Sequence, residues 1–177
     1  AFTSSTTSTW DGFVIENGRL TTDQYGAGVY LRQYGTVKNS IIRNDTIMSN
    51  IGNAYGGGVY MNYGTLENCE VYGNMARYNG TSGYYAYGGG VSANYGTIVG
   101  CHIHNNQTQG YNSSNYARGG GVYAHNLVNV SGCTITNNYA YNGQGGGIYA
   151  NGNNNSNRAN ISDCLIEKNR SGNGAGI

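Results

Sequence analysis

Histidine and cysteine are the side chains of this 177-residue sequence best suited to bind a transition metal. His102 and His104 flank Ile103, and alternate residues of a strand share one face, so their imidazoles could chelate an ion. We place neither Cys101 nor a carboxylate on that face, and no CxxC or Cys/His spacing typical of zinc occurs. We therefore expect exposed polar histidines, no metal site and no cofactor.

The carboxylates carry the other chemistry to be weighed, that of a polysaccharide lyase or glycoside hydrolase. A lyase needs clustered carboxylates around calcium and a nearby basic residue, whereas a glycosidase needs two carboxylates facing one sugar. The 8 Asp and Glu residues are scattered, and Glu70 and Glu167 fall in coils at least two apart. We expect no catalysis in these residues and keep a carbohydrate-active enzyme of the pectin-lyase-like type as the alternative.

Tyrosine gives the clearest binding signal, with 18 copies in the chain. Six of them fall in segments of variable length that we expect to be loops, namely Tyr78, Tyr84, Tyr85, Tyr87, Tyr111 and Tyr116. Loop tyrosines offer amphipathic contact area at a modest entropy cost, which suits recognition of a protein or a glycan. The expected partner is a host or neighbouring-cell protein or glycan.

A glycine-rich motif of the form GGGVY organises the whole chain. Copies and close variants occupy residues 26–30, 56–60, 88–92, 119–123 and 145–149, with a shortened one at 174–177. A fixed period of about 30 residues indicates a stacked array of structural units. Six aligned copies also exclude a single phosphate-binding loop.

Each copy is followed by a second block of alternating apolar residues, at 36–42, 65–71, 97–103, 129–135 and 160–166. Period-two alternation indicates strands, and Tyr-Gly pairs such as Tyr63-Gly64 indicate turns between them. Residues 10–15 form a degenerate earlier copy, in which Phe13 takes the position that a cysteine holds in four of the later blocks. We predict an all-β fold, a right-handed parallel β-helix of about six coils that spans residues 1–177 as one segment. We expect it to lack caps at both ends and to be a fragment of a longer chain.

Three kinds of side chain recur in fixed slots and predict ladders along the axis. The small residues Cys69, Cys101, Cys133 and Cys164 should form a buried row, not disulfides. Asn74, Asn106, Asn138 and Asn169 should form an amide ladder, with Asp45 in the same slot. Tyr30, Tyr60, Tyr123 and Tyr149 should form an outward aromatic row that Ser92 interrupts.

Composition excludes several partners. The net charge of +1 provides no basic field for nucleic acid. No run approaches the roughly 18 apolar residues of a membrane-spanning helix, so we expect no direct insertion of this segment into a membrane. The first residues show no features of a signal peptide.

The repeat resembles those of secreted bacterial right-handed β-helix proteins, in particular the polymorphic outer membrane proteins, which pair a GGA[ILV] block with an FxxN block. Here Gly57-Gly58-Val59 pairs with Val71-Tyr72-Gly73-Asn74, with Gly in place of Ala and Val in place of Phe. These departures point to the wider class found in Gram-negative bacteria, including Bacteroidetes. The resemblance implies an exported, cell-surface or outer-membrane-associated segment with an adhesion or structural role. It also implies secretion machinery or an outer-membrane anchor acting through other regions.

Several triplets match glycosylation patterns. Asn79-Gly80-Thr81 and Asn112-Ser113-Ser114 are N-x-S/T triplets, which arise by chance in a chain this rich in Asn, Ser and Thr. Asp45-Thr46-Ile47 matches the short O-glycosylation pattern associated with Bacteroidetes export. Intact mass decides whether any of them is modified.

Overall fold

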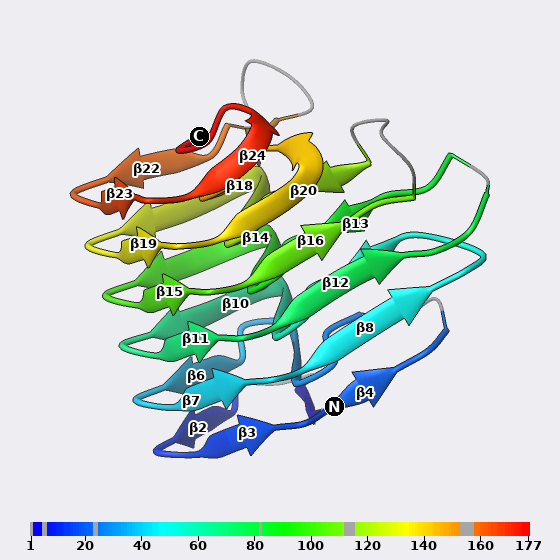
Figure 1. Ribbon diagram of the computed structural model, residues 1–177. Helices are drawn as coiled ribbons and strands as arrows, with labels where there is room; N and C mark the ends of the chain where they lie inside the picture. Colours follow the sequence, from blue (N-terminus) through cyan, green and yellow to red (C-terminus); the bar gives the residue numbers. More distant parts are fainter. Residues whose placement is uncertain (1, 5–6, 23–24, 82, 112–115, 153–157) are drawn as a thin grey trace.

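The chain winds into a right-handed stack of parallel β coils, as the computed structural model shows (Figure 1). The structure describes residues 2–4, 7–22, 25–81, 83–111, 116–152 and 158–177. Every regular element in these ranges is a strand, and the strands of successive coils pair in parallel over about five turns. The predicted parallel β-helix and its approximate coil count are confirmed.

Three sheets run along the stack. Sheet A comprises β1 (Phe2–Ser4), β2 (Thr9–Asp11), β5 (Val29–Arg32), β6 (Thr36–Lys38), β10 (Val59–Glu67), β14 (Val91–Val99), β18 (Val122–Ser131), β21 (Ile148–Asn151) and β22 (Asn160–Ser162). Sheet B comprises β3 (Val14–Glu16), β7 (Ile41–Arg43), β11 (Glu70–Tyr72), β15 (His102–His104), β19 (Thr134–Thr136) and β23 (Leu165–Glu167). Sheet C comprises β4 (Arg19–Leu20), β8 (Thr46–Ser49), β9 (Ala54–Tyr55), β12 (Met75–Tyr78), β13 (Ala86–Tyr87), β16 (Gln107–Gln109), β17 (Ala117–Arg118), β20 (Tyr139–Gln144) and β24 (Arg170–Asn173).

The predicted Tyr-Gly turns bend the strands without always ending them. Around Gly35 the strand does end, because β5 and β6 are separate elements. In the next two coils, β10 and β14 continue through Tyr63 and Tyr95 as nine-residue strands. Both tyrosines adopt positive φ, 63° and 68°, so the backbone turns a corner while Gly64 and Gly96 stay paired. The turns predicted at Tyr63-Gly64 and Tyr95-Gly96 are therefore present, but the expectation that they separate two strands was wrong.

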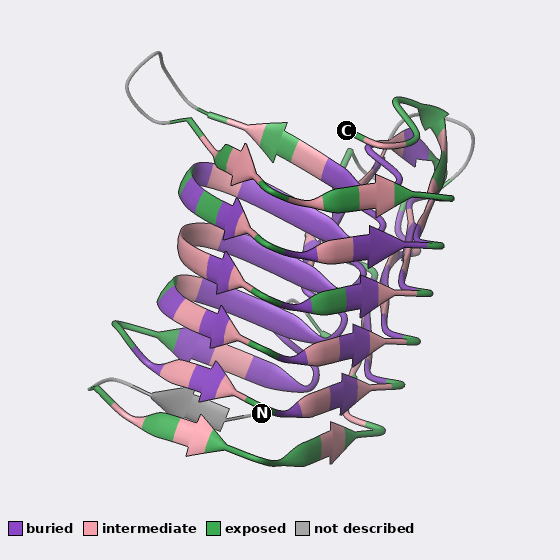
Figure 2. Cartoon of the chain, turned by 90° about the vertical axis from the view of Figure 1, so that its left-hand side faces the viewer, coloured by how far each residue is buried: buried purple, intermediate pink, exposed green. Residues whose placement is uncertain are grey.

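The core consists of apolar rows that lie inside the coils (Figure 2). Leu66 pairs in register with Val37 and Ile98, and Ile103 pairs with Val71 and Ile135, all of them buried. Each row repeats one side chain per coil, so burial is shared between neighbouring coils. The end coils are more exposed, since Ile15 and Ile166 are only partly buried whereas Ile42 and Ile135 of the same inward row are fully buried.

The cysteine row is confirmed. Cys69, Cys101 and Cys133 are buried free thiols in the main core, and Cys164 is half-buried. Each thiol donates to the carbonyl oxygen two residues earlier, at 3.2 Å for Cys69 to Glu67 and 3.3 Å for Cys101 to Val99. Ser40 occupies the same slot and donates to Lys38 O at 2.7 Å, so the slot selects a small side chain with one weak donor.

The asparagine ladder is also confirmed. Asn74 Nδ2 donates to Asn106 Oδ1 and Asn106 Nδ2 donates to Asn138 Oδ1, both at 3.0 Å. The same oxygens accept the backbone N–H of the preceding ladder residue, and the second amide hydrogen goes to a backbone carbonyl, such as Ile42 O at 3.0 Å. Every amide in the buried part of the ladder is satisfied, which buried polar groups require.

The third glycine of each motif provides the space for this ladder. A Cβ on Gly58 would lie 2.8 Å from Asn74 Nδ2, and one on Gly121 would lie 2.8 Å from Asn138 Nδ2. The first glycine has a different role, because Gly56 adopts φ of 70°, a conformation that side chains rarely take. Both requirements recur once per coil and explain why the glycines recur.

Candidate functional site

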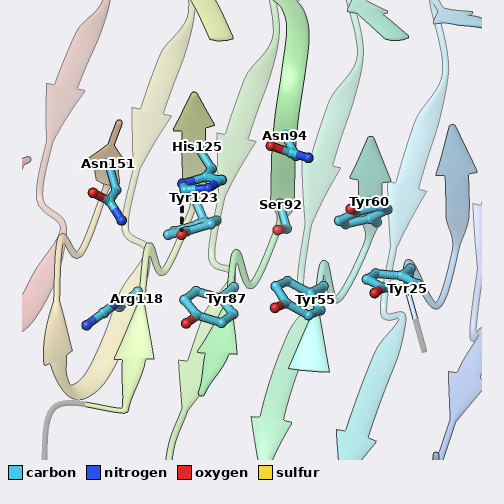
Figure 3. A pocket seen from close by; sticks show the side chains of 10 residues that line it. All are labelled: Tyr25, Tyr55, Tyr60, Tyr87, Ser92, Asn94, Arg118, Tyr123, His125 and Asn151. Carbon is cyan, nitrogen blue, oxygen red and sulfur yellow. Dashed lines mark hydrogen bonds between the residues drawn. The ribbon is translucent and has the colours of Figure 1, made fainter. Parts of the chain in front are cut away.

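A groove lined mainly by tyrosine runs along the corner where sheet C meets sheet A. It has a volume of about 330 Å³, at the low end of the range for small-ligand pockets, about 300–1,000 Å³. Figure 3 shows its side chains in two facing rows. The lining residues are Tyr25, Tyr55, Tyr60, Tyr87, Ser92, Asn94, Arg118, Tyr123, His125 and Asn151.

The glycine motif itself builds this corner. The residue before the first glycine lies on one wall and the residue five positions later lies on the other, as with Tyr55 and Tyr60 or Arg118 and Tyr123. The three glycines between them turn the chain, and each residue of the first wall faces the second-wall residue of the next coil, as Tyr25 faces Tyr60 and Tyr87 faces Tyr123 with ring centroids 4.5 Å apart (Figure 3). Each coil therefore adds one pair of lining residues.

The wall contributed by sheet C is a stack of aromatic rings. Tyr55 pairs in register with Tyr25 and with Tyr87. The Tyr55 and Tyr87 ring centroids are 4.9 Å apart with an angle of 11° between the rings, and Tyr25 lies 5.2 Å from Tyr55. This separation matches the spacing of strands in a sheet, so the coil repeat sets the stacking distance.

The opposite wall is the predicted tyrosine row on sheet A. Tyr30, Tyr60, Ser92, Tyr123 and Tyr149 occupy consecutive positions of one row, as expected. Their outer face is not open to solvent, however, because the tyrosines of sheet C pack over it and leave Tyr60 and Tyr123 only 9% and 6% exposed.

Ser92 leaves a gap in the tyrosine row. Tyr60 and Tyr123 lie on either side of it, two coils apart, which corresponds to roughly 9.6 Å. A tyrosine at this position would continue the row, whereas serine contributes no ring. Ser92 lies in the middle of the lining residues (Figure 3) and is only 1% exposed, because neighbouring side chains cover it.

Arg118 closes one end of the sheet C wall and brings the positive charge of the groove. It pairs in register with Tyr87, and its guanidinium carbon lies 4.3 Å from the centroid of the Tyr85 ring and 5.1 Å from that of Tyr149. Its Nε is buried and has no hydrogen-bond partner among the described residues. None of the described lining residues is a carboxylate, so no opposing charge in the groove neutralises the half-buried guanidinium, a group that pairs with anions.

The titratable groups of the groove are held neutral by their surroundings. Burial raises the pKa of Tyr60 and of Tyr87, and raises the pKa of Tyr123 to about 12. Burial also lowers the pKa of His125, whose Nδ1 lies 3.4 Å from the Tyr123 hydroxyl. At neutral pH the walls therefore present neutral phenols and an imidazole, which are hydrogen-bonding groups.

The six tyrosines predicted as loop binding residues divide into two groups. Tyr78 lies in β12 at 1% exposure within a second apolar cluster, and Tyr87 lies in β13 within the stacked wall. Their assignment to loops was wrong, because the segment beyond the asparagine ladder returns as a paired strand. Tyr84 and Tyr111 are exposed, and Tyr85 and Tyr116 contact each other with ring centroids 5.1 Å apart. Of the six, only Tyr87 lines the groove in the described part of the chain.

Sequence reasoning missed Tyr25, Tyr55 and Arg118. A signal was present, since each immediately precedes the first glycine of a motif copy, as Tyr87 and Gln144 do. Alignment on the glycines alone would have revealed this second row.

The prediction that no carboxylate shares the face of His102 and His104 was wrong. Glu70 pairs in register with His102 one coil away, and its Oε1 lies 3.1 Å from His104 Nε2. The two positions are 32 residues apart in sequence but in the same slot of adjacent coils, which brings their side chains together.

The glycosylation triplets lie in different settings. Asn112-Ser113-Ser114 lies outside the described residues. Asn79 is half-buried, and its N–H donates to Ser49 O at 2.8 Å. Thr46 is a half-buried residue of β8.

No protein-family model, curated protein or solved structure matches this chain. No helix in the described part of the chain is long and apolar enough to span a membrane. The fold and the groove define its class, a parallel β-solenoid with an aromatic corner groove.

Proposed function

We propose that this β-solenoid is an exported, cell-surface or secreted segment that adheres to an acidic glycan through the tyrosine groove. One observation carries the proposal: stacked tyrosine rings face the gap in the opposite row at Ser92 and end at the half-buried guanidinium of Arg118. The apolar C–H faces of sugar rings pack on aromatic rings, while phenol and amide groups bond to hydroxyls. A guanidinium recognises the carboxylate of a uronic acid.

The resemblance of the repeats to those of secreted bacterial β-helix proteins supports the surface role and the export. A solenoid also suits adhesion physically, because it presents a rigid groove without a separate scaffold. Binding without turnover is the function that the described groove favours, since its lining lacks the paired carboxylates of a glycosidase.

The test measures binding of a uronic-acid oligosaccharide and of a neutral oligosaccharide of the same linkage, by titration calorimetry. We expect the acidic glycan to bind more tightly. Arg118→Gln should weaken its binding by about 10- to 100-fold, the loss expected for one charge-assisted hydrogen bond, and should leave the neutral glycan nearly unchanged. Glutamine is the natural residue of the next coil, Gln144, so the variant is compatible with the fold.

Arg170→Gln is the matched control. Arg170 also stacks on a tyrosine, 5.1 Å from the Tyr139 centroid, but lies outside the groove lining. Equal affinity for both glycans, or equal losses in the two variants, would refute the proposal. Unsaturated uronic-acid product would replace it with the lyase alternative, for which the Tyr123 and His125 pair offers a proton-transfer contact.

A further inference from the structure

Sheet B carries a cluster of metal-ligating side chains on its outer face, away from the tyrosine groove. His102 and His104 are alternate residues of β15 and lie on one face of the sheet, where Glu70 of β11 is the neighbour of His102 in the coil before. One potential ligand atom from each residue lies within 4.8 Å of the other two. Two imidazoles and a carboxylate form a donor set that binds zinc and related divalent ions.

The separations suit a tetrahedral ion after a small adjustment. Ligands about 2.0–2.1 Å from zinc at tetrahedral angles are separated by roughly 3.3 Å. Glu70 Oε1 and His104 Nε2 already lie 3.1 Å apart, and the two histidine rings have centroids 4.1 Å apart. His102 is exposed, so its ring is free to rotate toward the other two ligands without disturbing the core.

His104 is held in place by its neighbours. Its ring stacks on Tyr72 with centroids 5.0 Å apart and an angle of 9°, and Asn105 Nδ2 lies 2.9 Å from its Nδ1. These contacts direct Nε2 toward Glu70. In a metal complex Nδ1 carries the proton, and the Asn105 amide can reverse to accept it through Oδ1. An outer partner that orients a ligating histidine is typical of zinc sites.

We propose that Glu70, His102 and His104 form a binding site for a divalent transition-metal ion of the zinc type, which links two adjacent coils. Three protein ligands leave one tetrahedral position for water or for a donor atom of a partner molecule. The carboxylate and the two imidazoles come from β11 and β15, so the bound ion adds a direct link between strands that already pair through their backbones and contact each other through side chains.

The experiment titrates the full chain with Zn²⁺ by calorimetry and with Co²⁺ by visible absorption, which reports the coordination geometry. We expect about one ion per chain and a Co²⁺ spectrum of low coordination number. His102→Thr, His104→Thr and Glu70→Gln should each weaken binding by at least the roughly 10- to 100-fold that loss of an outer-shell partner costs. The threonine variants copy Thr134 and Thr136 of the next coil, so they are compatible with the fold.

Glu167→Gln is the matched control, because Glu167 is an exposed carboxylate of the same sheet face, in the row of His104 and two coils away from it. It should bind Zn²⁺ like the wild type. The double variant H102T/H104T keeps His125 and all the cysteines, so binding that persists in it would assign the ion elsewhere and overturn the proposal. Absence of binding to the wild type, or a loss in Glu167→Gln equal to that in Glu70→Gln, would also overturn it.

Discussion

The backbone N–H of Asp45 donates to Asn74 Oδ1 at 2.9 Å, so Asp45 stands in the asparagine ladder but lacks the amide that continues it. Its Oδ1 accepts from Gly18 N at 2.7 Å, while its buried Oδ2 has no hydrogen-bond partner among the described residues. Burial raises the pKa of the Asp45 carboxyl from 3.8 to about 7, against the opposing effect of the Gly18 hydrogen bond. The carboxyl is therefore stable in the ladder mainly in its neutral form.

Asp45→Asn should stabilise the protein, and more so at higher pH. The native state binds a proton that the unfolded state releases between pH 3.8 and about 7, so wild-type stability should fall as pH rises through this window. The full loss is on the order of 4 kcal/mol, and the asparagine variant should not show it. Urea unfolding at pH 5 and pH 8 measures the difference, and parallel pH profiles for the two proteins would contradict this account.

Gly58→Ala should destabilise the chain through the same ladder. The new Cβ would lie 2.8 Å from Asn74 Nδ2, which donates to Ile42 O and to Asn106 Oδ1. Displacing this amide should lower the free energy of unfolding by roughly 2–5 kcal/mol, which denaturant unfolding measures.

Gly83→Ala is the matched control for that substitution. Apart from its chain neighbours, no atom of the described residues lies within 4 Å of a Cβ built on Gly83, and surface changes of this kind usually stay within about 0.5 kcal/mol. Similar losses of unfolding free energy in Gly58→Ala and Gly83→Ala would show that the asparagine ladder does not require glycine at position 58.

The cysteine row should remain reduced. Strand spacing of about 4.8 Å would in itself permit a disulfide between neighbouring coils, but the side chains run parallel and each thiol bonds to a carbonyl oxygen. Thiol titration without reductant should give four reactive thiols after unfolding and slow reaction of the three buried ones before it. A count of two would indicate a disulfide instead.

The repeat alignment predicted the ladders because each depends on one residue type in one slot per coil. Asn106, Cys101 and Ile103 lie where their slots placed them, since the coil spacing leaves little freedom. The alignment was less informative beyond the asparagine row, where insertions change the length of each repeat. The return strands β9, β13 and β17 form there, so Tyr87 was assigned to a loop although it stacks on Tyr55.

The groove was missed for a related physical reason. It arises from two rows that face each other across a glycine corner, and the direction of that corner follows from backbone angles such as φ of 70° at Gly56. The sequence shows Ser92 where the other coils have tyrosine, but it shows this only as an interruption of one tyrosine row. Only the packing of Tyr55 and Tyr87 against that row places the interruption among the lining residues of a groove.

The most direct test of the central claim is the affinity of Ser92→Tyr for a uronic-acid oligosaccharide. Tyrosine occupies this slot in the coils on either side, as Tyr60 and Tyr123, so the variant should fold and should fill the gap with a ring. Ser162→Tyr adds the same group to the same sheet outside the groove lining and should bind like the wild type. If the groove is the binding site, calorimetry should show a loss of at least about 10-fold, or 1.4 kcal/mol, for Ser92→Tyr alone. Wild-type affinity in a folded Ser92→Tyr protein would contradict the account.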